Sequence, residues 1–279
     1  MGEPMRTNGR IFWDGEHLQK HQHPVSVLYI QAVCDDDKKR CASLPVKNSK
    51  ANDVLGQAIS DYYHQTMKGK LWIHNTYGRK ESMPVDTYFR DEEYLTDLEM
   101  IALEQSTGTV LDIGAGAGSI SLQLQQLNKN VTALEISPLA ASVIQMRGVK
   151  QVVQQDIFNF TGAQFDTLLL LMNGIGLTGD IAKLRVFLQN AKSLIRPGGQ
   201  LLFDSSDVAY LYGKQTSLPK HYYGEIMYQY EYKKQKTDWF NWLYIDRHLL
   251  TTIALEEGWN CSVIFDDEYE QFLARLNRL

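Results

Sequence analysis

The chain has 279 residues, of which 44% are hydrophobic, enough to bury the core of one large domain or two small ones. Its formal net charge of −5, with no long basic stretch that carries interleaved aromatic residues, argues against a nucleic-acid partner. There is no apolar run near the ~20 residues of a membrane helix and no signal peptide, and the three cysteines match neither a disulfide framework nor a zinc site. We therefore expect a cytoplasmic protein without membrane attachment.

Residues 1–50 carry few structural signals, and we interpret them as an extension followed by a linker. Two short stretches, 11–13 and 25–30, have strand character. His17, His21 and His23 lack the accompanying cysteines or carboxylates of a ligand pattern, so we interpret them as solvent-exposed. No metal site is expected.

Two helices are predicted between residues 51 and 108, because apolar residues recur at helical spacing over 54–64 and 91–104. The connection between them, 67–90, is punctuated by glycine and proline and is unusually rich in aromatic residues. We expect this region to form a helical cap that precedes the main domain.

The stretch 109–120 is typical of a short buried strand that breaks into a glycine turn and opens a helix. Gly114, Gly116 and Gly118 allow positive φ where the chain reverses, and they let a ligand approach the backbone closely. The helix that begins near Ser119 presents unpaired N–H groups at its start. The turn is therefore a candidate ligand site.

The next strand, 131–136, carries Glu135 about twenty positions after the first glycine, the spacing of a carboxylate that holds a ribose. Two nucleoside sites fit this pattern. In a dinucleotide site the helix N-terminus holds a pyrophosphate, whereas in an S-adenosylmethionine site Asp112 faces the ammonium of the ligand. A carboxylate at Asp112 suits a cation and repels pyrophosphate, so it favours the second site.

Strands and helices then alternate, which predicts a parallel sheet covered on both faces. Ser137 caps the second helix directly after the strand that bears Glu135, so this carboxylate lies at the carboxyl end of its strand. A third strand, 151–155, ends at Asp156 and Ile157.

The continuous apolar run 165–172 indicates a central strand buried on both faces. It ends at Met172, Asn173 and Gly174. Ligands of open α/β sheets bind at the carboxyl ends of strands, so we expect these residues near the reacting group of the ligand.

Three further features complete the pattern. A helix over 181–194 is closed by Arg196-Pro197-Gly198-Gly199 and is followed by a strand over 200–204. An aromatic hairpin is predicted within 205–245. The last two strands, 260–265 and 270–276, are joined by about four residues, which is too short for a parallel crossover and predicts an antiparallel pair.

Together, the glycine turn after Asp112, the carboxylate of Glu135, the Arg-Pro-Gly-Gly turn and the antiparallel final hairpin resemble class I S-adenosylmethionine-dependent methyltransferases. The resemblance implies an α/β fold with a seven-stranded, mostly parallel, doubly wound sheet and an antiparallel last strand. We expect an N-terminal helical cap over 51–108 and a methyltransferase core over 109–279, with the β-hairpin inserted at about 205–245.

The resemblance also implies S-adenosylmethionine as cofactor and S-adenosylhomocysteine as product. The residues expected to bind the cofactor lie in the glycine turn and at the ends of three strands: Asp112, Gly114, Ala115, Gly116, Gly118, Glu135, Ile136, Asp156, Ile157, Met172, Asn173 and Gly174. Asp156 is expected near the adenine amino group, and the alternative is that it caps a loop.

In similar methyltransferases the N-terminal segment folds over the cofactor, which makes Tyr62, Tyr63, Tyr88 and Arg90 candidate contacts. Packing of the cap onto the core explains the same aromatic residues. The aromatic face of the hairpin is interpreted as a lid over a substrate pocket, with a dimer contact as the alternative; it comprises Ile226, Tyr228, Tyr230 and Tyr232. Tyr88, His221 and Tyr223 are the candidate substrate contacts.

The implied reaction is transfer of the sulfonium methyl group to N, O or S of a small molecule. Because the sulfonium is already activated, positioning and desolvation suffice and no catalytic side chain is assigned. Two alternatives stay open: a non-catalytic protein that binds S-adenosylmethionine or a partner, since fold does not fix function, and an NAD-dependent oxidoreductase. The chain is expected to be a monomer or a homodimer.

Overall fold

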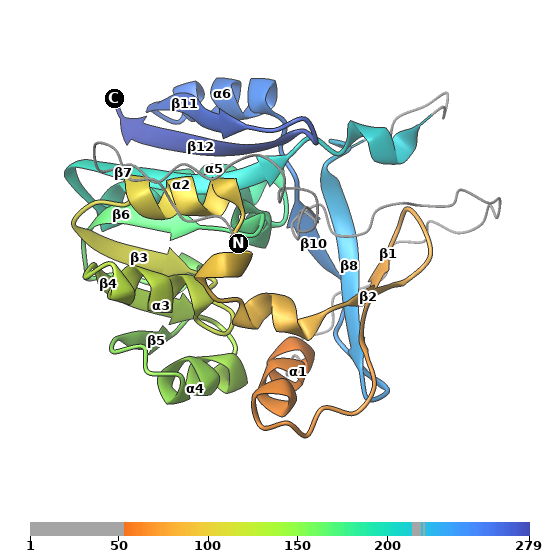
Figure 1. Cartoon of the computed structure of the whole chain (residues 1–279). Helices are drawn as coiled ribbons and strands as arrows, with labels where there is room; N and C mark the ends of the chain where they lie inside the picture. The colour runs from red at the N-terminus through yellow and green to blue at the C-terminus, as the bar shows by residue number, and fades with distance from the viewer. Residues whose placement is uncertain (1–52, 214–218, 220) are drawn as a thin grey trace, which may run out of the picture.

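The computed structural model describes residues 53–213, 219 and 221–279 (Figure 1). These residues form a large sheet covered by helices and a smaller sheet beside it. The predictions for residues 1–50, including the histidines His17, His21 and His23, lie outside the described residues.

The large sheet has seven strands in the order β11-β12-β7-β6-β3-β4-β5. Their bounds are β3 (Thr109–Ile113), β4 (Asn130–Glu135), β5 (Val152–Gln154), β6 (Phe165–Leu170), β7 (Ile195–Ser206), β11 (Trp259–Asp266) and β12 (Gln271–Arg278). Strands β3 to β7 pair in parallel, and β12 pairs antiparallel with both β7 and β11. The predicted seven-stranded sheet with an antiparallel last strand is confirmed.

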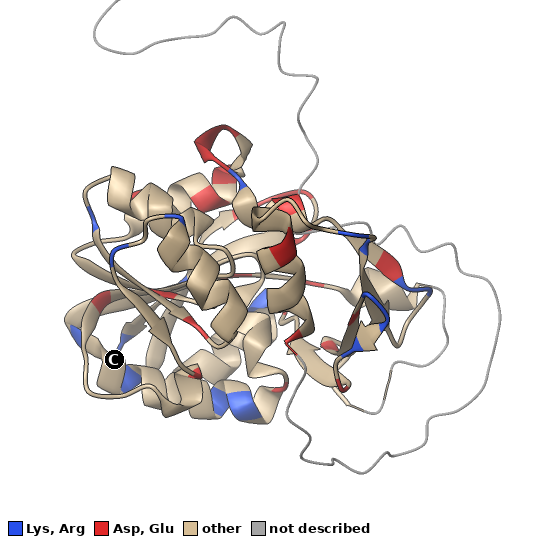
Figure 2. Cartoon of the chain, turned by 90° about the horizontal axis from the view of Figure 1, so that it is seen from below, with Lys and Arg blue, Asp and Glu red and all other residues tan. Residues whose placement is uncertain are grey.

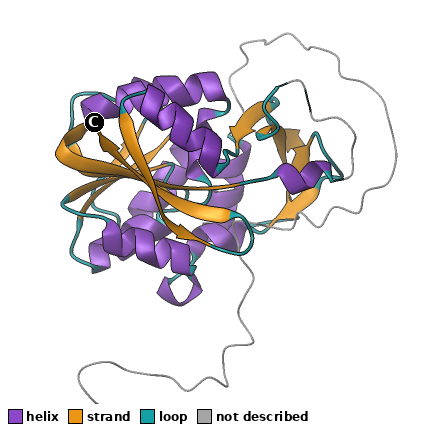
Figure 3. Cartoon of the chain, turned by 90° about the horizontal axis from the view of Figure 1, so that it is seen from above, coloured by secondary structure: helices purple, strands orange, loops and turns teal. Residues whose placement is uncertain are grey.

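Helices cover both faces of this sheet (Figure 3). One face packs against α2 (Asp97–Gln105), α3 (Ser119–Gln126) and α4 (Pro138–Met146), and the other packs against α5 (Ile181–Leu194) and α6 (Arg247–Glu256). Strand β6 shows why both faces are apolar: Leu168 and Leu170 join one core, and Leu169 joins the other. A strand covered by helices on both sides has no solvent face to present.

The smaller sheet is built from segments far apart in the chain. It pairs β10 (Phe240–Leu243), β8 (Glu225–Tyr232), β1 (Leu71–Asn75) and β2 (Glu81–Met83) in that order, all antiparallel, and β9 (Gln235–Lys236) returns along β8. Helix α1 (Val54–Tyr63) packs against β8 and α4. The predicted hairpin after the fifth strand is present as β8, β9 and β10.

The region 51–108 differs from the helical cap expected for it. Both predicted helices form, but the connection between them contains β1, which pairs with β8 of the inserted hairpin, and β2, which pairs with β1. Helix α2 packs on the large sheet beside α3 instead of on the small sheet. Pairing with a strand over 150 residues away leaves no local periodicity, so the sequence pattern did not reveal it.

Short 3-10 segments connect these helices and strands. They are η1 (Val85–Phe89), η2 (Glu92–Tyr94), η3 (Ile157–Asn159), η4 (Gly174–Thr178) and η5 (Ala209–Tyr212). In the part of the chain that the structure describes, no helix has the length and apolar character needed to cross a membrane.

Candidate active site

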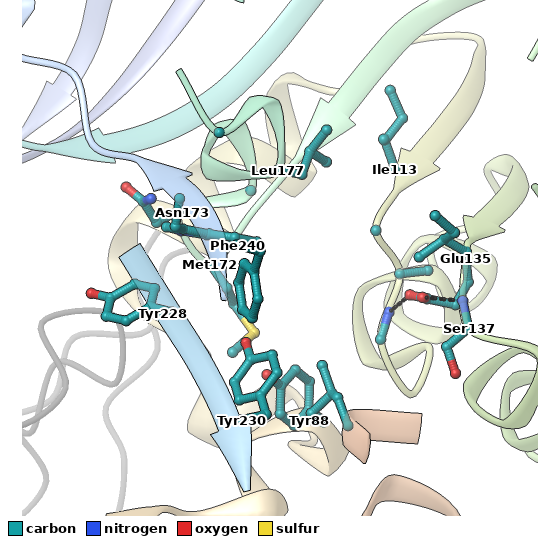
Figure 4. A pocket seen from close by; sticks show the side chains of 18 of the residues that line it. Tyr88, Ile113, Glu135, Ser137, Met172, Asn173, Leu177, Tyr228, Tyr230 and Phe240 are labelled. Atoms are coloured by element: carbon teal, nitrogen blue, oxygen red, sulfur yellow. Dashed lines mark hydrogen bonds between the residues drawn. The ribbon is translucent and has the colours of Figure 1, made fainter. Parts of the chain in front are cut away.

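A cavity of about 1320 Å³ lies between the carboxyl ends of the large sheet's strands and the small sheet (Figure 4). The order of the large sheet reverses between β3 and β6, and both strands end at this cavity, as expected of an open α/β sheet. A pocket for one drug-sized ligand occupies about 300–1,000 Å³. The cavity therefore has room for a cofactor and a second, smaller molecule.

The glycine turn forms one wall of the cavity. Gly114, Gly116 and Gly118 all have positive φ, at 73°, 59° and 84°. At Gly116 a Cβ would lie 2.9 Å from Cδ1 of Tyr88, so the ring of Tyr88 packs directly on the glycine backbone. Gly118 is the N-cap of α3 and points away from the cavity, because a Cβ there would lie 3.1 Å from the Ile144 side chain.

Asp112, the last residue but one of β3, is a buried carboxylate with an exposed fraction of 3%. Ser121 Oγ donates a hydrogen bond of 2.6 Å to its Oδ2. Burial raises the pKa of Asp112 to about 6, and the nearby charge of Glu135 acts in the same direction. Among the described residues no cation pairs with Asp112. A positively charged group of a ligand at this position would therefore form an ion pair with a carboxylate that has no other counterion among those residues.

Glu135 is the last residue of β4, and its carboxylate accepts hydrogen bonds from two different loops. The Gly116 N–H donates to Oε2 and the Ser137 N–H donates to Oε1, each at 2.9 Å, as the dashed lines in Figure 4 show. Burial raises the pKa of this carboxyl. Each oxygen keeps a free lone pair, and a pair of ribose hydroxyls could donate to them.

Asp156, the third acidic residue predicted to bind the cofactor, both caps a short helix and lines the cavity. Asp156 caps η3, since its Oδ1 accepts the Phe158 N–H at 2.9 Å, and it also lines the cavity. The loop-capping alternative is thus present, and it leaves Oδ2 available to a ligand. Ile136 and Ile157 line the cavity beside it and provide an apolar surface for a planar ring.

The end of β6 carries an unusual backbone. Met172 and Asn173 both have positive φ, at 62° and 54°, although neither is glycine. Both carboxylate oxygens of Asp204 accept the Asn173 N–H, and Asn173 Nδ2 donates to the Leu243 carbonyl of β10 at 3.1 Å. Asn173 Oδ1 is buried and has no hydrogen-bond donor in the described part of the molecule.

The segment η1 is anchored on the glycine turn. Ser119 Oγ donates to the Tyr88 carbonyl at 2.9 Å, and the Arg147 guanidinium donates to the Ala117 carbonyl at 2.6 Å and lies 4.9 Å from the Phe89 ring. These contacts hold the Tyr88 ring in place over Gly116.

Opposite the glycine turn, the small sheet closes the cavity with aromatic side chains. Figure 4 shows Tyr228, Tyr230 and Phe240 across the cavity from Glu135 and Ser137. The further aromatic lining residues of this sheet and its flanks are Tyr77, Trp239, Trp242 and Tyr244. The hairpin therefore covers the cavity, the geometry expected of a lid, through Tyr228 and Tyr230 of its predicted aromatic face.

All the residues expected to bind the cofactor line the cavity except Gly118. Of the other candidates, Tyr88 and Arg90 line it, but Arg90 is committed to a buried pair with Glu99, with nitrogen–oxygen distances of 2.9 and 2.5 Å. Tyr62 and Tyr63 do not line it; Tyr62 instead stacks on Phe89 at 4.8 Å.

The expectation for His221 and Tyr223 is corrected. His221 is exposed, and neither residue lines the cavity. The Tyr223 hydroxyl donates to Asp207 at 2.8 Å, outside the cavity. Both precede the first strand of the hairpin, and the chain enters β8 only after them, so proximity in sequence did not bring them to the site.

Sequence reasoning missed the residues that β1, β2 and their turn contribute, including Tyr77 and Glu81. The aromatic content of 67–90 indicated that this segment could contribute to a site, but nothing in the local sequence marked Glu81, on the three-residue strand β2, as part of it. Its position depends on a pairing with distant strand β8.

Comparison with known proteins agrees with this geometry. Residues 111–203 match the model of a methyltransferase domain family. The crystal structure of an S-adenosylmethionine-dependent methyltransferase from Bacteroides fragilis, in complex with S-adenosylhomocysteine, is 39% identical, with a TM-score of 0.76 over 81% of this chain and 94% of that one. Nodulation protein S of Rhizobium tropici is 25% identical over 169 residues, which are 59% of this chain and 68% of that protein. The PH0226 protein of Pyrococcus horikoshii shares the fold at 14% identity, with a TM-score of 0.55 over 70% of this chain and 96% of that one.

The fold and the site define a Rossmann-like enzyme that binds a nucleoside at the carboxyl edge of its sheet. The chain belongs to the class I S-adenosylmethionine-dependent methyltransferases. Its cofactor is S-adenosylmethionine.

Proposed function

We propose that this methyltransferase moves the sulfonium methyl group to N, O or S of a small-molecule acceptor. The observation that carries the proposal is the cavity itself, which has a polar end formed by the glycine turn and an aromatic end closed by the small sheet. A macromolecular acceptor would need an open groove, whereas here β8 and β10 cover the acceptor end.

The residues at the polar end fit the cofactor. Asp112 is a buried carboxylate that can pair with the ammonium of the methionine part, and Glu135 has lone pairs for the ribose hydroxyls. The backbone of Gly114 and Gly116 leaves space where a side chain would intrude. Asp156 is proposed to accept from the adenine amino group.

When bound, the cofactor supplies a methyl group on a sulfonium that needs no further activation. The protein's part is to align the acceptor and to exclude water. The η1 segment and the aromatic lid enclose the cavity, and Asn173, held by Asp204, lines the centre of it. Tyr88 and the lid tyrosines stay neutral, since burial raises the pKa of Tyr88, Tyr228 and Tyr230.

Charge over the rest of the surface offers little attraction to a polyanion. Three lysines on or beside the small sheet form ion pairs, Lys80 and Lys236 with Glu231 and Lys233 with Asp61. Acidic and basic residues lie interspersed over both parts of the described molecule (Figure 2). This distribution supports a small acceptor over a nucleic acid.

The test is calorimetric titration of S-adenosylmethionine and S-adenosylhomocysteine, with NAD as control, into the wild type and Asp112→Ala. Micromolar binding of both sulfur ligands, weakened by the substitution, is expected, followed by methyl transfer to a panel of small amines, phenols and thiols. Binding without transfer to any acceptor would favour a non-catalytic protein. Tighter binding of NAD would overturn the assignment of the site.

A further inference from the structure

The acidic residues that line the cavity divide into two groups. Asp53, Asp112, Glu135 and Asp156 lie at the cofactor end. Glu81 belongs to β2 of the small sheet and lies at the acceptor end. It is half-buried and accepts a hydrogen bond of 3.3 Å from Asn75 Nδ2.

The Glu81 carboxylate lacks a counterion within the described residues, since no side-chain nitrogen of a lysine, arginine or histidine lies within 4 Å of its oxygens; the neighbouring Lys80 pairs with Glu231 instead. The basic residues that line the cavity are Arg90, which is paired with Glu99, and Lys183, which is exposed in the first turn of α5. Burial raises the pKa of Glu81 to about 7. A partly buried carboxylate without a cation is unfavourable, and a positively charged ligand would relieve that penalty.

Tyr77 and Tyr244 lie near Glu81, and Tyr228 joins them in one cluster of hydroxyl groups. The Tyr228 hydroxyl is 3.5 Å from that of Tyr77 and 3.2 Å from that of Tyr244. The charge of Glu81 is near enough to raise the pKa of Tyr77 and of Tyr244, the latter to about 12 when burial is included. These rings are neutral at physiological pH and present π faces, which attract organic cations.

A buried amide oxygen that lines the cavity also lacks a hydrogen-bond donor among the described residues. Asn173 Oδ1 is buried without a hydrogen-bond donor in the described chain, and Asn173 lines the same cavity. A ligand with N–H groups would satisfy it, whereas an anionic ligand would present further acceptors.

We propose that the methyl acceptor is a small organic amine, positively charged in its free form, that binds with its ammonium group between Glu81 and the rings of Tyr77, Tyr228 and Tyr244. This inference rests on the proposed small-molecule methyltransferase function and specifies its substrate class. Glu81 acts as a binding residue that selects for positive charge. An ammonium nitrogen has no lone pair, so the bound amine would give a proton to water before it reacts. The nitrogen–methyl bond would then form as the sulfur–methyl bond breaks, which leaves S-adenosylhomocysteine and the methylated amine.

The experiment measures binding of three probes of similar ring size and different charge: benzylamine, benzyl alcohol and benzoate. Each is titrated at pH 8 into the full chain saturated with S-adenosylhomocysteine. We expect benzylamine to bind at least tenfold more tightly than benzyl alcohol and benzoate to bind most weakly. Glu81→Gln keeps the shape and the bond to Asn75, and it should abolish the preference for benzylamine.

Glu104→Gln is the matched control, because Glu104 is exposed on α2 and does not line the cavity. It should behave as the wild type does. Equal or tighter binding of benzyl alcohol or benzoate, no binding of benzylamine, or an unchanged preference in Glu81→Gln would each overturn the inference. The wild-type series alone tests it where Glu81→Gln does not fold. Failure of S-adenosylhomocysteine to bind in the first step would instead count against the proposed function.

Discussion

Both carboxylate oxygens of Asp204 lie 2.8 Å from the backbone nitrogen of Asn173. This contact joins the end of β7 to the turn after β6, where two consecutive non-glycine residues have positive φ. Such a backbone is unfavourable without support, and Asp204 is buried directly behind it with an exposed fraction of 1%.

Replacing Asp204 by Asn should release this turn. Asparagine keeps one of the two oxygens that accept the Asn173 N–H, and its amide NH2 group, a donor, replaces the other oxygen and faces that N–H. Burial raises the pKa of Asp204 to about 7, so removal of the buried charge offsets the lost hydrogen bond, and we expect little net change in the free energy of unfolding. Methyl transfer should slow by about tenfold or more, since an increase of about 1.4 kcal/mol in the activation free energy suffices for that. Denaturant unfolding and single-turnover transfer measure the two effects. The control is Asp266→Asn, an exposed pair with Arg247; comparable slowing of methyl transfer there would contradict the role of Asp204.

Binding of the cofactor should weaken in acid because of Asp112. Its pKa is about 6 in the folded protein, so the carboxylate is neutralised as the pH falls through 6 and no longer attracts the cofactor's ammonium. The affinity for S-adenosylhomocysteine, measured by calorimetry from pH 8 to pH 5, should decrease below about pH 6. Glu135, whose pKa is also raised, contributes to the same decline. Asp112→Asn should bind more weakly at pH 8, by roughly tenfold or more, and lose part of the pH dependence; an unchanged profile would contradict the assignment.

The same substitution should stabilise the free protein at neutral pH. The pKa of Asp112 in the folded protein, about 6, lies above the ordinary value of 3.8. As the pH rises from 4 to 6, the carboxyl ionises more readily in the unfolded chain than in the folded protein, so the free energy of unfolding falls, and it stays lower above pH 6. Asp112→Asn removes up to about 3 kcal/mol of this penalty. Thermal melts should give equal midpoints near pH 4 and a higher midpoint for the variant at pH 7.5. A variant that is less stable at pH 7.5 would show that hydrogen bonding outweighs the burial of charge.

Gly116→Ala tests the contact between the glycine turn and Tyr88. The new methyl would lie 2.9 Å from the ring, and displacing the ring or the turn should cost about 1–3 kcal/mol beyond the strain of positive φ. Gly162→Ala is the matched control, since Gly162 also has positive φ, at 86°, and has no atom within 4 Å of a new Cβ. Urea unfolding and S-adenosylhomocysteine titration should show a larger loss for Gly116→Ala in both quantities. Equal losses would mean that only backbone strain matters.

The pair between Arg90 and Glu99 is expected to stabilise the fold. Both side chains are at most 8% exposed, and Glu99 also completes the N-terminal cap of α2 with Thr96. Arg90→Met alone should lower the free energy of unfolding by about 3–5 kcal/mol, because it leaves a buried carboxylate unpaired. The double variant with Glu99→Leu should recover much of that loss, apart from the helix cap. Urea titration of both checks this, and a double variant no more stable than Arg90→Met would contradict it.

The sequence by itself determined the large sheet and the polar end of the cavity. Their signals are local: positive-φ glycines at 114, 116 and 118, a carboxylate one strand later, and an apolar run at 165–172 that suits burial on both faces. A turn and the strands beside it depend on a few consecutive residues, so pattern and position suffice to find them.

Only the tertiary structure decided the acceptor end. Strand β1 pairs with β8, about 150 residues later, and carries β2 with it, which brings Glu81 near Tyr77 and Tyr244. His221 and Tyr223 looked well placed because they precede the hairpin, yet neither lines the cavity. Which side chains line a cavity depends on long-range pairing and on the direction in which each strand enters the sheet, and neither quantity leaves a period in the local sequence.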